Sequence, residues 1–365
     1  MDFALTEDQE AVVELARQIL GDRATSDRLR ELEAGTDWID HDLWAELAKA
    51  DLLGLCLPEA RGGGGYGFLE ACLLLEAQGR TVAPLPLWGT LVGGLALAEF
   101  GGDTHGSLLA GIVDGSTVLT LAVTEAGGDP RRPVAVRAER QGSELVLTGS
   151  KTLVPLAHVA RAALVSVDVV GEGAGVVVVP LDADGLVAER QDTFSHEPSA
   201  LIRFDGVVVG ADALLGAPGD SVLGWLVDRA TVGLCAITAG VAERAMRITA
   251  EYTTTRKQFD KPIGSFQAVG QRMADCYVDN EAIRLTMLAA ASRLAEGQAA
   301  DAEVAVAKYW AADGGSRVAH AALHIHGGIS IDLDYPIHRY FGWFKHIELQ
   351  LGNPRLGFEQ AIGDF

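Results

Sequence analysis

The sequence predicts an α+β protein of several domains, with helices in its first and last parts and strands between them. Apolar residues follow helical spacing up to about residue 115 and again from about residue 219. Between these limits, short β-branched runs are separated by Gly, Asp and Pro, which is typical of a β-barrel or sandwich. We therefore expect an N-terminal α-helical domain (1–115), a middle β domain (116–218) and a C-terminal α-helical bundle domain (219–365).

The first domain opens with a capping box, Thr6–Gln9, followed by an apolar helical stripe. The residues of that stripe are Val12, Val13, Leu15, Ala16, Ile19 and Leu20. Further helices are expected over 40–51, 68–79 and 88–100. Gly62–Gly67 formally matches a dinucleotide fingerprint, but no βαβ unit and no acidic residue about 20 positions on accompany it. We interpret this segment as a glycine turn leading into the helix at 68.

In the middle domain, strands are expected at Thr117–Val123, Leu145–Leu147, Ala163–Val167, Val176–Val179 and Ile202–Phe204. Thr124–Asp129 follows the first of these strands. The simpler interpretation is a turn. The alternative is a glycine-rich loop whose backbone N–H groups approach an aromatic ligand closely.

Long helices are expected in the last domain over 220–257, 265–296, 300–325 and 335–351. We expect Pro262 to end the first of these helices and Gly264 to permit the turn that follows. Arg256 is consistent with two interpretations. Basic residues favour the dipole at a helix C-terminus, and Arg256 with Gln258 could instead hold a phosphate-bearing cofactor.

His326–Gly328 follows the third of these helices, where glycine commonly ends a helix. His320 and His324 lie at helical spacing before it, but no carboxylate is close in sequence to complete a metal site. We therefore expect no metal here.

Composition excludes several classes of protein. The formal net charge of −21 argues against a nucleic-acid binder. Scattered cysteines, without zinc or disulfide spacing, indicate a reducing, cytoplasmic setting. The N-terminus lacks the features of a secretory signal, and we expect no apolar run near the roughly 18 residues that span a bilayer. No Gly-x-Ser-x-Gly elbow occurs, which disfavours a hydrolase.

Several short motifs occur in the order in which one family carries them. They are Pro58–Gly63, Glu76–Arg80, Leu121–Glu125, Leu147–Lys151, Phe204–Val209, Arg256–Phe259 with Lys261–Ile263 and Phe266–Gln267, and His326–Gly328. On these motifs the chain resembles the acyl-CoA dehydrogenase family over essentially its whole length. The resemblance implies an N-terminal helical domain, a middle β-barrel and a C-terminal four-helix bundle.

The resemblance also implies FAD as cofactor, an acyl-CoA thioester as substrate, α,β-dehydrogenation, and an electron-transfer flavoprotein as acceptor. Val123 and Thr124 would then lie by the flavin ring. The residues that would meet the FAD diphosphate and adenosine of a neighbouring subunit are Arg256, Gln258 and Phe259. His324, Gly327 and Gly328 would supply the other side of that shared site.

The chain departs from the family pattern where the chemistry is expected. Leu351 holds the place of the glutamate that removes the α-proton, and leucine cannot accept a proton. The loop at 124–129 is short and has lost its flavin-contacting serine. Residues 152–157 lack the aromatic residue that packs on the flavin, and Asp260 replaces a glycine beside the expected diphosphate.

Some family members carry the base elsewhere, one residue before an arginine, as in Asp228-Arg229. The spacing to Arg256 differs by two residues, which turns a helix by roughly 200° and would point Asp228 away. No confident catalytic residue therefore emerges from the sequence, and Asp228 is the remaining candidate.

The pattern is most similar to a subfamily of actinobacterial acyl-CoA dehydrogenases that act on steroid side chains as α2β2 tetramers of unlike subunits. One subunit keeps the base, and Val154–Val159, His338–Tyr340 and Leu349–Gly352 resemble the subunit that has lost it. We expect this chain to pair with a catalytic partner. The alternatives are a self-sufficient homotetramer using Asp228 and a structural subunit that binds neither FAD nor CoA.

Overall fold

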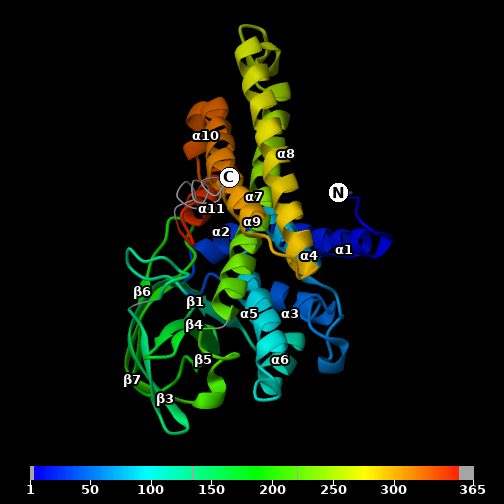
Figure 1. Cartoon of the computed structure of the whole chain (residues 1–365). Coiled ribbons are helices and arrows are strands. Elements are labelled where there is room, and N and C mark those ends of the chain that lie inside the picture. Colours follow the sequence, from blue (N-terminus) through cyan, green and yellow to red (C-terminus); the bar gives the residue numbers. More distant parts are fainter. Residues whose placement is uncertain (1–3, 134, 220, 353–365) are drawn as a thin grey trace. The chain divides into compact units, whose positions relative to one another are not determined.

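The computed structural model describes residues 4–133, 135–219 and 221–352 (Figure 1). Its elements confirm the predicted fold class, with an N-terminal helical domain, a middle β-sheet half-barrel and a C-terminal helical domain. Contacts divide the described residues into two compact units. Unit 1 draws on Met1–Glu31, Cys72–Ala83 and Thr231–Phe365, and unit 2 on Leu32–Ala71 and Pro84–Ala230. The domain boundaries near 115 and 218 stay predictions.

The N-terminal helices are α1 (Glu7–Arg23), α2 (Ser26–Glu33), α3 (His41–Lys49), α4 (Phe68–Thr81), α5 (Leu87–Phe100) and α6 (Gly106–Val113). The predicted capping box of α1 is confirmed. The Thr6 hydroxyl accepts from the Gln9 N–H at 3.3 Å, and the Gln9 side chain accepts from the Thr6 N–H at 3.0 Å. Gly62 and Gly65 adopt φ of 82° and 71° ahead of α4, so the glycine segment is a turn.

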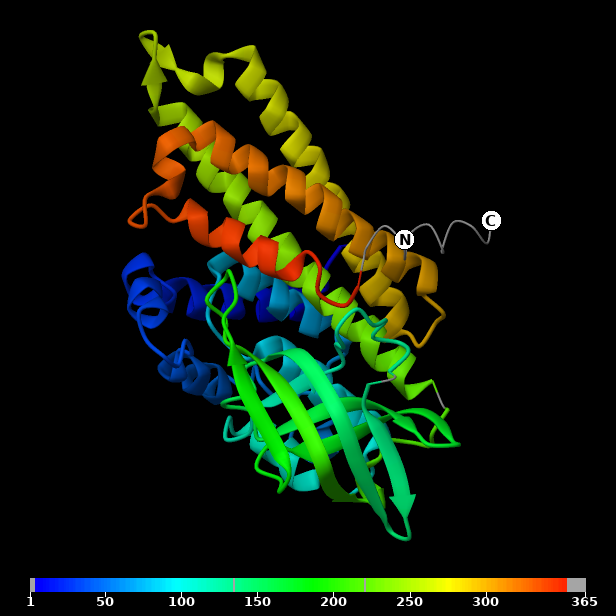
Figure 2. The ribbon, with the colours of Figure 1, turned by 90° about the vertical axis from the view of Figure 1, so that its left-hand side faces the viewer.

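The strands of the middle sheet are β1 (Leu119–Ala122), β2 (Arg137–Gln141), β3 (Glu144–Pro155), β4 (Ala162–Val169), β5 (Gly173–Pro180), β6 (Leu186–Gln191) and β7 (Ser199–Gly210). Their order is β1-β4-β2-β3-β7-β6, and β5 pairs with β4 (Figure 2). β1 runs parallel to β4, whereas β3 and β7 form a long antiparallel pair. One face of this curved sheet buries a valine-rich core that includes Val165, Val167, Val177 and Val179.

The C-terminal helices are α7 (Val222–Thr255), α8 (Gln267–Ala295), α9 (Asp301–Tyr309), α10 (Gly315–His326) and α11 (Ile337–Ile347). Figures 1 and 2 both show α7 and α8 side by side. A π-helical turn, Trp310–Gly314, interrupts the segment that was predicted as one helix over 300–325. The first residue of α10 is Gly315. A larger residue would not fit there, because a Cβ would lie 2.2 Å from Phe344 Cε2 of α11.

The link between α7 and α8 corrects one prediction. α7 ends at Thr255, well before Pro262, so Pro262 does not end that helix. Instead β8 (Lys257–Gln258) and β9 (Lys261–Pro262) form a hairpin with Phe259 and Asp260 at its tip. These two residues have φ of 52° and 64°, the signature of a tight I′ turn. Gly264 does not adopt the positive φ of a glycine turn. A Cβ at this position would lie 3.1 Å from Thr253 Oγ1, so close packing accounts for the glycine.

The expectation of no long apolar run was wrong for α7. This helix contains an 18-residue window of mean hydropathy 1.4, which is long and apolar enough to cross a membrane. However, 83% of that window is buried inside the protein. α7 therefore has the character of a core helix, hydrophobic all round because it is packed all round.

Candidate cofactor and active site

The hairpin presents Arg256, Gln258 and Phe259 on an exposed tip. The Arg256 N–H donates to the Tyr252 carbonyl at 2.9 Å, continuing the α7 ladder, and the Arg256 carbonyl accepts from the Ile263 N–H at 2.9 Å. These two bonds tie the hairpin to the end of α7. The Phe259 side chain is nonetheless 87% exposed, with only the edge of Phe266 near its ring, at a centroid distance of 6.2 Å. An aromatic ring left so open is available to another molecule.

Asp260, the departure that would bring a carboxylate near a phosphate, is exposed at the same tip. Its backbone at φ 64° is one that Asp tolerates better than most residues with a side chain. Solvent screens an exposed charge, so Asp260 adds no buried repulsion to this region.

The end of α10 lies beside the end of α7 through a stacked pair of rings. Tyr252 stacks on His326 at 4.5 Å. The His326 ring is buried, with Nδ1 donating to the Ala322 carbonyl at 2.7 Å and Nε2 accepting from the Tyr335 hydroxyl at 3.0 Å. Burial lowers the pKa of His326, which favours this neutral arrangement. His326 is therefore a structural residue that fixes the turn after it.

Gly327 and Gly328 form that turn, as the sequence predicted for a helix end. Gly327 caps α10 with φ 64°. A Cβ on either glycine would meet nothing within 4 Å, so the backbone here is open to a ligand. The structure thus brings the Arg256 hairpin and the Gly327–Gly328 turn to one end of unit 1. Guanidinium groups and open backbone N–H groups are the kinds of donor that bind a diphosphate.

His324 lies one turn before this end and is exposed. Its Nδ1 contacts a guanidinium nitrogen of Arg272 on α8. Both residues line a groove of about 740 Å³ between α8 and α10, which Arg317 also lines. His320 is engaged separately, because its Nδ1 donates to the Ser316 carbonyl at 2.8 Å. We call the set Arg256, Gln258, Phe259, His324, Gly327 and Gly328 the adenosine end of the candidate site.

The other predicted residues lie in unit 2, at the end of β1. Val123 is buried and Thr124 is half-buried. The Thr124 carbonyl accepts from the Thr152 N–H at 3.0 Å. The short loop after Thr124 and the segment after Lys151 are therefore neighbours. We call Val123, Thr124 and residues 152–157 the ring end.

A buried ion pair supports the ring end, and sequence reasoning missed it. Lys151 is fully buried, and its Nζ donates to Glu125 Oε1 at 2.6 Å and to the Ser166 hydroxyl at 2.8 Å. Glu125 also accepts from the N–H groups of Ala135 and Val136 at 3.0 and 3.3 Å. Burial lowers the pKa of Lys151, and Glu125 opposes that shift. Glu125 and Lys151 both occur in the quoted motifs. Their ion pair forms only when β1, β3 and β4 come together in the folded sheet, so the sequence alone does not show it.

The backbone after Lys151 is irregular. The register of β3 on β7 shifts between Lys151 and Val154. Leu153 and Leu156 adopt φ of 52° and 50°, and the Leu153 N–H donates to Gln191 Oε1 at 2.9 Å. Leu153 is 46% exposed, so this segment offers an aliphatic side chain where the family carries an aromatic one. The ring end therefore lacks an aromatic side chain at the segment that follows Lys151.

Leu351 is half-buried on the turn after α11, with φ 60°. A buried lysine holds this turn. Lys308 Nζ donates to the carbonyls of Glu348 and Gln350 at 3.2 and 2.6 Å. Desolvation lowers the pKa of Lys308 to about 8. The support for the turn is present, but its leucine has no proton acceptor.

Asp228, the alternative base, lies in the first part of α7 and is ion-paired with Arg131 from the loop after β1. The positive charge of the guanidinium offsets the negative charge of that carboxylate. Arg229 is buried with its guanidinium 3.7 Å from the Trp225 ring centroid. Asp228 and Arg229 therefore both make side-chain contacts within unit 2, and these contacts give each residue a structural role.

This architecture is the acyl-CoA dehydrogenase fold. Residues 6–113 match the family's N-terminal domain and residues 220–353 its C-terminal domain. The chain belongs to the acyl-CoA dehydrogenase family, whose members are oxidoreductases of β-oxidation and steroid degradation.

Individual proteins and solved structures of this family are also similar to the chain. Acyl-CoA dehydrogenase FadE27 of Mycobacterium tuberculosis is 38% identical, with 99% of each chain covered. A variant of the Tcur3481-Tcur3483 steroid ACAD is 43% identical at a TM-score of 0.92, with 98% of each chain covered. The ChsE4-ChsE5 complex from Mycobacterium tuberculosis is 37% identical at a TM-score of 0.94, covering 100% of this chain and 98% of that one.

Proposed function

We propose that this chain is the base-lacking subunit of an FAD-dependent acyl-CoA dehydrogenase and works with an unlike, catalytic partner subunit. The observation that carries the proposal is the contrast between the two ends of the candidate site. The adenosine end keeps its arginine, its exposed hairpin and its open glycine turn, whereas the ring end and the turn with Leu351 lack the side chains of the chemistry. Two of the similar solved structures carry paired names, which fits a partner of a different sequence.

In the proposed complex, this chain lends contacts to an FAD whose ring lies in the partner. Arg256 and Gln258 would hold the diphosphate from one side, and His324 with Gly327 and Gly328 from the other. Phe259 would pack against the adenosine. When bound, FAD supplies the oxidation of the acyl chain, accepting a hydride from the β-carbon.

The partner would also supply the base that removes the α-proton, because a positioned carboxylate is needed next to the thioester. An acyl-CoA with a steroid side chain is the proposed substrate, and an electron-transfer flavoprotein the proposed acceptor. Both rest on the relatives and on the family, as does the proposed cytoplasmic location.

The first experiment compares the chain alone with the chain co-expressed with an adjacent acyl-CoA dehydrogenase gene. We expect the isolated chain to show little flavin absorbance and no turnover of acyl-CoA substrates with an artificial electron acceptor. The co-expressed pair should be yellow, of equal stoichiometry and active, with two FAD per tetramer of two copies of each chain. Turnover by the isolated chain near 1–10³ s⁻¹, the ordinary enzyme range, would overturn the proposal. Four FAD per tetramer would overturn the assignment of the two ends.

A further inference from the structure

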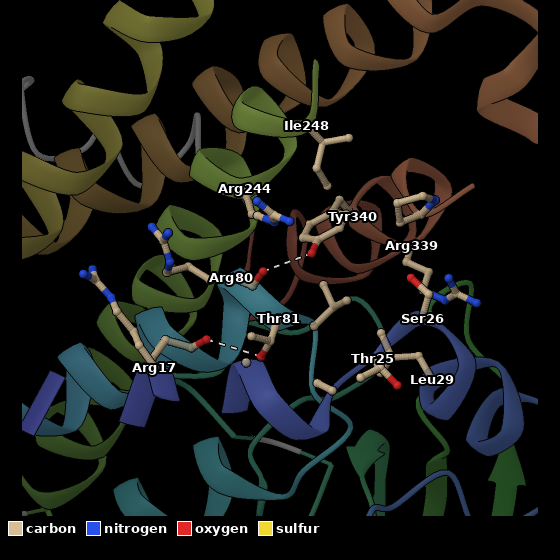
Figure 3. A pocket seen from close by; sticks show the side chains of 15 residues that line it. Arg17, Thr25, Ser26, Leu29, Arg80, Thr81, Arg244, Ile248, Arg339 and Tyr340 are labelled. Atoms are coloured by element: carbon tan, nitrogen blue, oxygen red, sulfur yellow. Dashed lines mark hydrogen bonds between the residues drawn. The ribbon is translucent and has the colours of Figure 1, made fainter. Parts of the chain in front are cut away.

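Four arginine side chains gather in unit 1 at a pocket that none of the candidate-site residues lines. Arg17 of α1, Arg80 of α4, Arg244 of α7 and Arg339 of α11 line one pocket of about 400 Å³ (Figure 3). We call it the arginine pocket. Its described lining includes no acidic side chain and no residue of the adenosine end. This is unusual in a chain whose formal net charge is −21.

Two carboxylates near the pocket, Glu243 and Glu76, are each shared between two arginines. Glu243 pairs with Arg80 at 2.5 Å and also with Arg247 at 2.5 Å. Glu76 pairs with Arg284 at 3.0 Å and reaches Arg17 only at 3.8 Å. Neither carboxylate is therefore dedicated to a single arginine of the pocket.

The arginines also act on one another and on the phenol between them. Burial lowers the pKa of Arg17, and the charge of Arg80 adds to that effect. Tyr340 donates its hydroxyl hydrogen to the Arg80 carbonyl at 3.0 Å. Burial raises the pKa of Tyr340, while a hydrogen bond from Arg244 and the charges of Arg80 and Arg339 act against that rise. Like charges held this close are stabilised by an anion placed among them.

The remaining wall supplies hydroxyl groups that also make local hydrogen bonds: Thr25 accepts from the Arg28 N–H at 3.3 Å, and Thr81 donates to the Gln78 carbonyl at 3.1 Å. Thr25 and Ser26 line the pocket at the start of α2, where first-turn N–H groups point out of the helix. Thr81 lines it from the end of α4. Figure 3 shows Thr25 and Ser26 below Arg339. Guanidinium forks, hydroxyls and a helix N-terminus are the groups that recognise phosphate and carboxylate.

We propose that the arginine pocket binds a doubly charged oxyanion on a small organic molecule, either a phosphate ester or a dicarboxylate. The volume exceeds what a single oxyanion fills, and Leu29, Val82 and Ile248 provide apolar wall for an organic part. Arg256 and the Gly327–Gly328 turn do not line this pocket, so it shares no lining residue with the proposed cofactor contacts.

The test is a calorimetric titration of the full-length chain with inorganic phosphate and, separately, with succinate, in potassium chloride of matched ionic strength. We expect saturable binding of at least one of them. R17Q and R244Q should each weaken it about tenfold, the loss of one charge-assisted contact. Tighter binding of phosphate would identify a phosphate ester as the ligand class, and tighter binding of succinate a dicarboxylate.

The matched control is R28Q. Arg28 lies on α2 beside the lining residue Leu29, but it pairs with Glu31 at 2.9 Å outside the pocket. We expect R28Q to bind as the wild type does. Equal loss in R28Q and R244Q would show a diffuse charge effect and overturn the proposal, as would absence of binding in the wild type. The R17Q change is on a side chain 45% exposed, so folding is retained even if R244Q destabilises the chain.

Discussion

The adenosine end in unit 1 and the ring end in unit 2 differ in how many side chains of the family pattern they retain. At the adenosine end, Arg256 and Phe259 remain exposed, and the backbone of Gly327 and Gly328 is open. At the ring end, the loop is short and Leu153 lies where an aromatic residue is expected. Buried lysines are present at the ring end, where Lys151 pairs with Glu125, and at the separate turn with Leu351, where Lys308 donates to two carbonyls. The buried residues that support the backbone are therefore present, whereas the side chains expected to act on the flavin and the substrate are absent. This is the pattern expected of a subunit that supports the site of a partner.

The largest expected effect concerns the contribution of the buried Lys151–Glu125 pair to the stability of the ring end. K151M leaves the Glu125 carboxylate buried without its cation, and we expect a loss of about 3–5 kcal/mol in the free energy of unfolding. Urea unfolding followed by circular dichroism measures it. R140A, which breaks the exposed pair of Arg140 with Glu172, should change stability little. The double variant K151M/E125Q should lose less than K151M alone, since it removes both charges. An equal loss in both variants would mean that the pair contributes only packing.

The second prediction uses pH on the buried lysine beside Leu351. Lys308 has a pKa of about 8 when folded, below the value of about 10.4 for an unfolded lysine. The unfolded chain therefore binds more protons between these values, and the stability contributed by Lys308 rises with pH. It is complete above about pH 10.4 and lost as pH falls through about 8. Relative to K308M, the wild type should gain about 2 kcal/mol from pH 8 to 10. Parallel pH profiles of the two proteins would contradict a depressed pKa.

The third prediction addresses the adenosine end directly. R256A in the co-expressed complex should weaken FAD retention about tenfold, because an Arg–phosphate contact is charge-assisted. Flavin absorbance after dialysis measures this. K257A, which removes an exposed positive charge from the adjacent residue, should leave FAD content unchanged. If both variants lose FAD equally, general charge attraction would replace a specific contact as the explanation.

The fourth prediction separates assembly from folding at the hairpin tip. F259A should change the unfolding free energy of the isolated chain by less than about 0.5 kcal/mol, because the ring is 87% exposed. In the complex it should weaken association several-fold, as expected for loss of an aromatic anchor. Sedimentation of the complex at decreasing concentration measures this. V187A, on β6 and 53% exposed, provides an apolar control outside the hairpin. Unchanged association in F259A would remove the tip from the interface.

The smallest effect is expected at Asp228. D228N should leave turnover of the complex within about twofold of the wild type, because Arg131 already occupies the carboxylate. Steady-state kinetics of the co-expressed pair test this. Loss of a general base typically costs 10²–10⁴-fold, so a fall of that size would restore Asp228 as the base.

The sequence predicted the fold class but missed elements whose residues do not alternate in burial. β2 has one buried residue, Ala138, and β6 is exposed along most of its length, so neither shows the burial period of a half-buried strand. Pro262 was a misleading signal because the chain had already left the helix at Thr255. The positive φ of Phe259 and Leu153 could not be predicted, since neither residue type prefers that conformation.

The candidate site was predictable only where neighbours in sequence are neighbours in space. Arg256–Phe259 and His326–Gly328 are local motifs, and their positions on a hairpin and a helix end follow from local signals. The Lys151–Glu125 pair depends on strand order, which spacing does not reveal. The arginine pocket draws Arg17, Arg80 and Arg244 from separate helices, so no window of the sequence contains it.

The interleaving of the two units bears on how the chain is made. Unit 2 is complete once Ala230 has been synthesised, but α1 belongs to unit 1, whose last described helix ends at Ile347. At the usual 5–20 residues per second of synthesis, α1 waits on the order of tens of seconds for the helices of its own unit. Meanwhile Val13, Ala16 and Leu20, buried in the finished protein, have only Cys72–Ala83 of the rest of their unit available. We expect a chaperone to hold the emerging N-terminus, and the C-terminal helices to release it.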